Sequence, residues 1–354
     1  MSSIEDLPEE IILKIFAFLS LKQLTKCMKV TKKMNRISQD KSLWKRVCSF
    51  YRKIPKECIH QIVKSSVKSI VFSHCEISPI PIELLQAYQF DLTYLDVSYC
   101  DGNDNFISEL VGCSKSLEYL RLHFNRPNLV NKCVQNLFSP NQIKIIDLSS
   151  FTNTYNPRQK LSFECVKKII DSCVLLTNIN FRKTKLSLKS IAYICENISI
   201  KLKGINLSHE CVQNVHIQSL VLRCKTLVHL DLCDTQIGYK ALCYIAKTQF
   251  ESLFSLALPT KIGIEMGLLE NVNYNKVSII YAMTNLSNLK IGNEWDQLVL
   301  DSNHQLVAQG HRELKRLFPG LNINQWPNWP CLITTDPSYF FQKQNKLMIE
   351  NKII

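Results

Sequence analysis

A short phrase of large apolar residues recurs along this chain of 354 residues. It has the form Leu-x-x-Leu-x-Leu, in which Ile, Val or Phe can replace Leu. A strand and a helix of this size bury their apolar faces only by stacking on similar neighbours. The phrase therefore predicts a stack of repeated units. Its clearest copies begin at Leu92, Leu117, Leu202 and Leu227, and further copies begin at Val67, Ile143, Leu176, Leu253, Leu286 and Phe318.

The intervals between the copies indicate the kind of unit. Six of the nine intervals are 25 or 26 residues, and the other three are 32 or 33 residues and imply short insertions. The pattern resembles leucine-rich repeats, which run at about 20–29 residues with one strand and one helix each. We therefore predict an α/β fold, in which a curved leucine-rich-repeat solenoid of about ten units occupies residues 67–325.

Each unit also carries a helical half before the next strand. Apolar residues three or four positions apart mark this half. Cysteines share its register, which resembles the cysteine-containing subtype of the repeat. Their scatter along the chain favours buried free thiols over disulfides and indicates a reducing compartment, the nucleus or the cytoplasm. The clearest helical patterns are Leu110, Cys113 and Leu117, then Ile170, Cys173 and Leu176, then Leu220, Cys224 and Leu227.

The intervening residues of each strand are expected to form the concave surface of the solenoid, because strand side chains alternate between two faces. This row mixes polar, aromatic and charged residues, as a surface that binds another protein does. A simpler interpretation is that many of them are only solvated. The residues that we expect to contact a target protein are Tyr94, Asp96, Tyr119, Arg121, His123, Asn180, Arg182, Asn206, His229 and Asp231.

The first part of the chain, residues 4–50, does not follow the phrase and reads as three or four short helices. Asp6–Glu9 and Ser20–Gln23 resemble capping boxes that begin the first two helices. Asp40 is expected to begin a fourth helix that contains Val47. So small a module buries too little surface to be very stable alone. Two interpretations stay open, a docking module for a partner and a helical cap for the first repeat.

The same region resembles an F-box, on Leu7-Pro8, Ile12, Ile15-Phe16, Leu19, Leu24, Cys27, Val30 and Ser42-Leu43-Trp44. Met34 departs from the pattern, since many family members carry Trp there. The resemblance implies docking onto the adaptor S-phase kinase-associated protein 1 and, through it, onto a cullin. The adaptor-binding residues that it implies are Leu7, Pro8, Ile12, Ile15, Phe16, Leu19, Leu24, Val30 and Trp44.

An F-box followed by leucine-rich repeats resembles the substrate receptors of cullin-RING ubiquitin ligases. The resemblance implies a non-catalytic subunit of an SCF-type complex that presents a target protein for ubiquitination and proteasomal degradation, with cell-cycle control among the expected roles. It allows a phosphorylated target, for which Arg121 and Arg182 are candidate contacts, and a small accessory protein. The alternative is an interaction scaffold that works outside a ligase.

The chain is thus expected to divide into an F-box at residues 1–50, a helical linker at 51–66, the repeats and a tail at 326–354. Pro55 is expected to begin the linker helix, which would make a stiff connection. The tail starts with Trp326-Pro327-Asn328-Trp329-Pro330, which cannot be a regular helix because proline interrupts it. It is expected to cap the last unit, to line the concave surface, or both.

The formal net charge of +13 is compatible with nucleic acid or an acidic partner. The densest basic cluster is Lys29, Lys32, Lys33 and Arg36, and a solvated helix face explains it as well. Because no long basic stripe follows the repeats, we do not expect nucleic acid. The sequence contains no Gly-rich phosphate loop, no G-x-S-x-G and no C-x-x-C, so we expect no catalysis, no cofactor and no metal. No apolar stretch reaches the length of a membrane span.

Overall fold

The computed structural model of the chain forms two compact units. The first contains residues 1–144 and 172–174, and the second contains residues 145–171 and 175–354. The residues that it describes are 4–50, 53–65, 67–78, 91–102, 104–123, 125–139, 141–150, 160–249, 251–268, 272–292 and 315–323. The tail after residue 325 and its five aromatic side chains lie outside the described residues.

Short helices open the first unit, as the sequence predicts. Thr31 begins the third of them by accepting a hydrogen bond from the backbone of Met34 at 3.2 Å, and Gln23 caps the second through the backbone N–H of Ser20 at 2.8 Å. The elements are η1 (Ile4–Asp6), α1 (Glu9–Phe16), α2 (Leu21–Cys27), α3 (Lys32–Ser38) and η2 (Lys41–Trp44).

The prediction of a fourth helix is wrong beyond the first turn. Asp40 does accept a hydrogen bond from the backbone of Ser42, at 2.8 Å, but the helix is a single 3₁₀ turn that ends at Trp44. Val47 lies instead in strand β1 (Arg46–Phe50), which pairs in parallel with β3 (Ser69–Ser73). The sheet therefore begins before the first predicted repeat.

Parallel strands line up in the order β1, β3, β5 and β7 in the first unit, and β2, β4 and β6 form a second small sheet. Glycine is required at Gly102, where φ is +110° and a Cβ atom would lie 2.5 Å from the carbonyl oxygen of Ile77. The other elements of this unit are β2 (Lys53–Ile54), α4 (Lys56–Lys64), β4 (Glu76–Ile77), β5 (Tyr94–Asp96), β6 (Asp101–Gly102), α6 (Asp104–Cys113), β7 (Tyr119–Arg121) and α7 (Pro127–Gln135).

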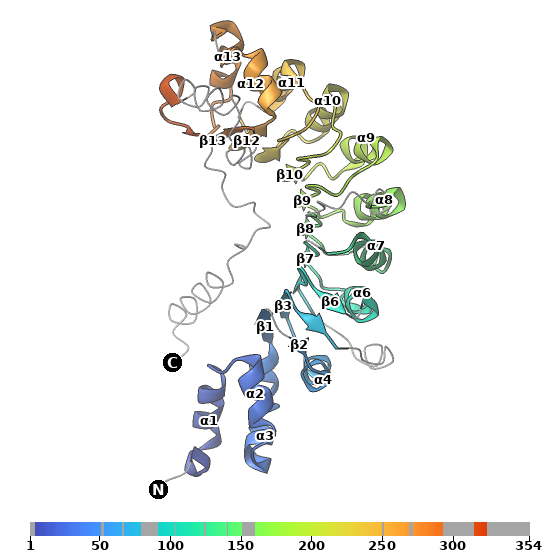
Figure 1. Cartoon of the computed structure of the whole chain (residues 1–354), viewed down its shortest axis with the longest axis vertical. Coiled ribbons are helices and arrows are strands. Elements are labelled where there is room, and N and C mark those ends of the chain that lie inside the picture. The colour runs from blue at the N-terminus through green and yellow to red at the C-terminus, as the bar shows by residue number, and fades with distance from the viewer. Residues whose placement is uncertain are drawn as a thin grey trace, which may run out of the picture. The chain divides into compact units, whose positions relative to one another are not determined.

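The second unit repeats the alternation of strand and helix, with neighbouring strands parallel and in chain order. Helices α8 to α11 all lie on one side of its strands (Figure 1). Its elements are β8 (Ile145–Asp147), α8 (Phe163–Ser172), β9 (Asn178–Asn180), α9 (Leu188–Asn197), β10 (Gly204–Asn206), α10 (Asn214–Arg223), β11 (His229–Asp231), α11 (Tyr239–Gln249), β12 (Ser255–Leu258), α12 (Thr260–Glu265), α13 (Tyr274–Tyr281), β13 (Asn288–Ile291) and β14 (Asn322–Ile323).

A strand lies at every predicted copy of the phrase, and the arrangement is consistent with a repeat solenoid. The long interval after Leu253 contains two helices, α12 and α13, which account for the insertion. The last predicted copy of the phrase, which begins at Phe318, is displaced by two residues from the strand register. Because Leu289 pairs with Ile323, the residue opposite Leu286 is Gly320 and not Phe318.

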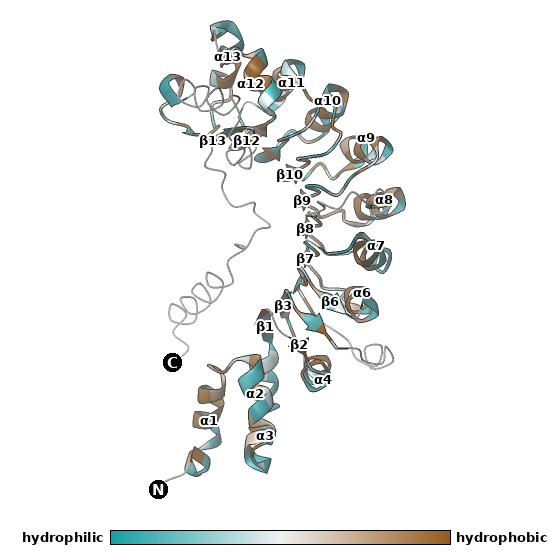
Figure 2. Cartoon of the chain, viewed as in Figure 1, coloured by the Kyte–Doolittle hydropathy of each residue, from teal (hydrophilic) through white to brown (hydrophobic). Residues whose placement is uncertain are grey.

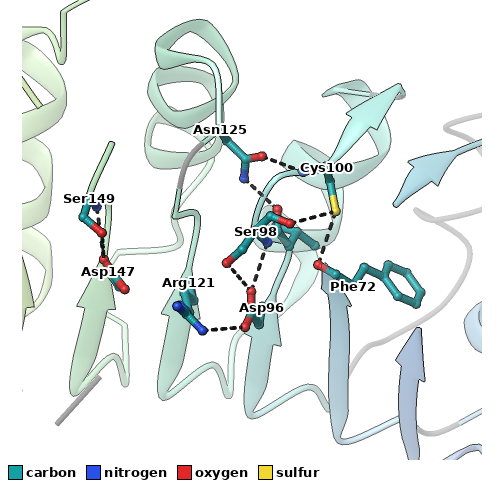
Figure 3. A network of polar contacts seen from close by, with 9 residues as sticks. Phe72, Asp96, Ser98, Cys100, Arg121, Asn125, Asp147 and Ser149 are labelled. Carbon is teal, nitrogen blue, oxygen red and sulfur yellow. Dashed lines mark hydrogen bonds and ion pairs between the residues drawn. The ribbon is translucent and has the colours of Figure 1, made fainter. Parts of the chain in front are cut away.

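The cysteines pack inside the units. All fourteen that the structure describes are free thiols, and nine of them are buried. Some thiols bond to the preceding repeat. The thiol of Cys100 donates to the carbonyl oxygen of Phe72 at 3.2 Å (Figure 3). The thiol of Cys75 donates to the carbonyl oxygen of Ser49 at 3.3 Å. Burial raises the pKa of the Cys173 thiol to about 12. These thiols therefore stay protonated and act as small apolar residues.

Candidate functional site

Helix α1 carries apolar residues on two faces. Ile12 is 0% exposed and Phe16 is 2% exposed, so one face packs against the other helices. Ile11 and Ile15, which lie about 100° away around the helix, are 41% and 38% exposed. Figure 2 shows helix α1 with broad hydrophobic colour. The sequence gives this short helix more apolar surface than the first unit buries.

The exposed face extends beyond the ends of α1. Phe18, in the turn after the helix, is 83% exposed. We call these exposed residues the α1 stripe: Ile4, Leu7, Ile11, Ile15 and Phe18. Five large apolar residues exposed within fifteen residues of chain are typical of a protein–protein contact. The stripe is therefore the best candidate for a docking surface in the first unit.

Helix α3 holds the start of the stripe in place. The ammonium group of Lys33 donates to the carbonyl oxygens of Glu5 at 2.6 Å and Leu7 at 3.0 Å. Arg36 forms an ion pair with Glu9. These contacts fix the chain before α1 against α3, so Leu7 is presented on an ordered backbone.

The structure divides the predicted adaptor-binding residues into two groups. Ile12, Phe16, Leu24 and Trp44 are buried, and the indole N–H of Trp44 donates to the carbonyl oxygen of Ser38 at 2.7 Å. These four residues hold the helices together. Leu7, Pro8, Ile15 and Val30 are exposed, and Leu19 is half-buried.

Sequence reasoning missed Ile4, Ile11 and Phe18 as surface residues. The spacing of Ile11, Ile15 and Phe18 at positions i, i+4 and i+7 marks one side of a helix, and that signal was available in the sequence.

Residues 4–49 match the family model described as F-box-like. The chain therefore carries an F-box-like domain. F-box domains bind the S-phase kinase-associated protein 1 adaptor and thereby a cullin. The matched segment ends inside β1, so the F-box-like domain and the parallel sheet share this strand.

Helix α4 packs against the F-box-like domain, and Cys58, Ile59 and Ile62 on its inner face are buried. The side chain of Gln61 donates to the carbonyl oxygen of Gln39 at 3.0 Å. Together with the pairing of β1 and β3, these contacts join the domain to the first repeat units. Helix α4 begins directly after Pro55, the residue that we expected to begin a helix here, and β1 connects the domain to the repeats before this helix.

The candidate target-binding residues of the first unit lie on the strand face opposite the buried leucines. The guanidinium group of Arg121 donates to the carboxylate of Asp96 at 3.2 Å, and both side chains are nearly buried (Figure 3). Aromatic rings lie beside this pair. Tyr94 and Tyr119 are 5.6 Å apart between ring centroids, and Tyr119 is exposed.

A second aromatic group lies just after these strands. The ring of Tyr99 stacks on His74 at 4.0 Å and meets His123 edge-on at 5.5 Å. His74 and Tyr99 both have φ of +54°, a backbone conformation that costs side-chain-bearing residues of order 1 kcal/mol. The predicted contact residue His123 is buried within this group.

Acidic and amide side chains end the strands in five repeat units. In each, the side-chain oxygen accepts the backbone N–H two residues later, as in an Asx turn. These bonds run from Ser98 to Asp96 at 2.9 Å, Ser149 to Asp147 at 3.1 Å, Arg182 to Asn180 at 3.0 Å, Ser208 to Asn206 at 2.9 Å and Cys233 to Asp231 at 3.1 Å. Asp96, Asn180, Asn206 and Asp231, which we expected to contact a target, are thus buried and used by the fold.

In the second unit, Arg182 and His229 are half-buried and keep part of their surface. Burial lowers the pKa of His229, which is therefore largely neutral at pH 7. The amide of Asn206 donates to the carboxylate of Asp231 at 3.1 Å. Burial raises the pKa of Asp231, while Arg182 and Lys290 nearby oppose this shift.

Glu210 is a further buried acid of the second unit. Its carboxylate accepts the backbone N–H groups of Lys185 at 3.0 Å and Leu186 at 2.7 Å, so it closes the turn of the preceding repeat. Burial outweighs these hydrogen bonds and raises the pKa of Glu210 to about 7.

Among the described residues, no three His, Cys, Asp or Glu side chains gather in a way that would hold a metal ion. No helix in the described ranges is both long and apolar enough to cross a membrane.

Proposed function

We propose that this chain is the substrate-recognition subunit of an adaptor–cullin–F-box ubiquitin ligase. The observation that carries the proposal is the F-box-like domain with its exposed α1 stripe. The stripe docks onto an apolar groove of S-phase kinase-associated protein 1, and the adaptor connects it to a cullin. The chain itself supplies binding surfaces and no catalytic group.

The outward strand faces bind the target protein. Of the residues predicted for this role, Tyr94, Tyr119, Arg182 and His229 keep accessible surface. Arg121 suits a phosphate poorly, because Asp96 already neutralises it in a nearly buried pair. Arg182 is therefore the better of the two candidate contacts to a phosphorylated target.

Within the class of F-box substrate receptors, the chain most resembles S-phase kinase-associated protein 2. The likeness rests on Arg223–Leu232 and Leu314–Asn324. It supports leucine-rich repeats as the repeat type, proteasomal degradation as the fate of the target and cell-cycle control as the setting, in the nucleus or the cytoplasm.

Co-purification of the full chain with adaptor and cullin tests the proposal. Replacing two exposed stripe residues, Ile11→Asp and Ile15→Asp, should remove both partners while the fold remains. The matched control is Leu188→Asp with Val215→Asp, two exposed apolar residues at the starts of α9 and α10. Retention of the adaptor by the stripe variant would count against the docking surface.

The rival function is an interaction scaffold that uses the F-box-like domain outside a ligase. A reconstituted reaction with ubiquitin, its activating and conjugating enzymes and the cullin complex separates the two. Transfer of ubiquitin to proteins that bind the chain supports the ligase. Adaptor binding without cullin recruitment or ubiquitin transfer supports the scaffold.

A further inference from the structure

Charge is unevenly distributed over the F-box-like domain. Residues 1–10 contain four acidic residues and no Lys or Arg, whereas residues 11–50 contain ten Lys or Arg and a single acid, Asp40. The domain is thus acidic up to the first turn of α1 and basic from Lys14 onwards.

Three exposed lysines lie along α2 and the turn that follows it. Lys22 and Lys26 are one helical turn apart in α2, and Lys29 lies in the turn two residues after the helix ends. Leu24, on the opposite side of the helix, is buried. We call these three residues the α2 lysine stripe. They differ from Lys33 and Arg36 of α3, which are used within the domain.

The α2 lysine stripe lies between two exposed apolar side chains. Phe18 precedes α2 and is 83% exposed, and Val30 follows it and is 62% exposed. Since α2 has seven residues, it is about 10 Å long. The lysines therefore lie between Phe18 and Val30 along the chain, so a partner that contacts both apolar residues reaches along the length of α2.

We propose that the α2 lysine stripe belongs to the adaptor-docking surface and that the partner presents carboxylates beside its apolar groove, facing α2. This inference rests on the proposed function. Its effect is on association rate and orientation more than on the strength of the final contact, because exposed charges act mainly by steering the encounter. The acids at residues 5–10 mark the other end of the surface and favour one orientation.

An acidic protein fits this surface better than the other polyanions. Glu10 and Asp6 are exposed where the α1 stripe begins, and an anionic membrane or a nucleic acid would repel them. Phe18 and Val30 need an apolar groove to be buried, and a nucleic-acid duplex presents phosphates on its surface instead. A protein groove with carboxylates on one side satisfies both features.

The test measures association of the full chain with purified S-phase kinase-associated protein 1 at several ionic strengths. The variant is Lys22→Gln, Lys26→Gln and Lys29→Gln together. The control removes the same charge from three exposed lysines of the second unit, Lys201→Gln, Lys225→Gln and Lys247→Gln. Circular dichroism and melting temperature establish that both variants fold like the unaltered chain.

We expect the α2 variant to associate about tenfold more slowly near 10 mM salt, with a small change in dissociation rate. Near 1 M salt, where charges are screened within about 3 Å, its rate should converge with that of the unaltered chain. The control variant should keep most of the rate at both salt concentrations, since its lysines lie outside the docking surface.

Two results contradict the inference alone: equal association rates for the two triple variants, or unchanged adaptor association together with lost binding to DNA or to anionic phosphatidylserine vesicles. Failure of the unaltered chain to bind the adaptor at every ionic strength contradicts the proposed function itself. The salt series therefore separates the two failures.

Discussion

Arg121 donates to Asp96 from the neighbouring strand at 3.2 Å, and this pair is nearly buried on the face that was expected to contact a target. The two residues occupy equivalent positions of successive repeats, since Asp96 pairs with Arg121 in the strand register. The contact shows that a charged residue on this face can serve the stack of strands.

Replacing Arg121 with Met should therefore lower the free energy of unfolding by about 3 kcal/mol, because Asp96 is left as a buried charge without its cation. Urea unfolding measures the change. The control is Lys53→Gln, which breaks the exposed pair with Glu76 and should cost well under about 1 kcal/mol. Equal effects of the two changes would show that burial does not strengthen the Arg121 pair.

The pKa of Glu210 predicts that stability decreases as pH rises. Because the folded-state pKa is about 7 and the ordinary value is 4.5, the folded state binds the proton more tightly than the unfolded state does. The contribution is fully present below about pH 4.5 and is lost as pH rises through about 7. The loss is of order 3 kcal/mol.

Urea unfolding at about pH 5 and pH 8 tests this effect as the difference between the unaltered chain and Glu210→Gln, which cannot titrate. The free energy by which the unaltered chain is more stable than the Glu210→Gln variant should shrink or reverse at the higher pH. Glu251→Gln changes an exposed acid and serves as the control. A pH-independent difference would show that the hydrogen bonds from Lys185 and Leu186 keep Glu210 charged throughout.

The free thiols predict a simple pattern of labelling. Cys211 is exposed, whereas nine of the other described cysteines are buried. Cys331 lies outside the described residues, so the test uses a chain in which it is replaced, Cys331→Ser. In this background, a water-soluble disulfide reagent should label Cys211 fastest, and Cys211→Ser should remove this fast phase. Labelling of Cys133 or Cys195 by mass spectrometry on the same timescale would contradict the burial of these thiols.

The joint between the F-box-like domain and the repeats predicts where flexibility matters. Trp44 packs in the domain, and β1 starts two residues later and pairs with β3. A Gly/Ser insertion after Trp44 should reduce ubiquitin transfer about severalfold while adaptor binding stays, because the target is no longer held at a fixed position. The same insertion after Lys53 lies beyond β1 and should have a smaller effect. Equal transfer by both variants would show that rigidity at this joint is unimportant.

The sequence predicted the strands well because each strand places large aliphatic residues at fixed intervals. The sequence pattern missed β1, because the three leucine positions of the phrase are occupied there by Trp44, Val47 and Ser49. Register alone reveals this strand, through the pairing of Val47 with Ile70. Pairing between strands is a tertiary contact that a single-chain pattern does not contain.

The candidate site was predicted less completely for a related reason. Alternation along a strand tells which side chains point outward, but not which of them bind each other. Asp231 and Asn206 were expected to meet a target, yet they bond to each other and to the backbone. The outcome depends on neighbours about 25 residues away in the chain.

The most direct test of the central claim is a calorimetric titration of the full chain with purified S-phase kinase-associated protein 1. We predict one-to-one binding by the unaltered chain and by the Leu188→Asp/Val215→Asp control, and loss of binding by Ile11→Asp/Ile15→Asp. Absence of binding by the unaltered chain, or equal binding by all three proteins, would contradict the docking of the F-box-like domain through the α1 stripe.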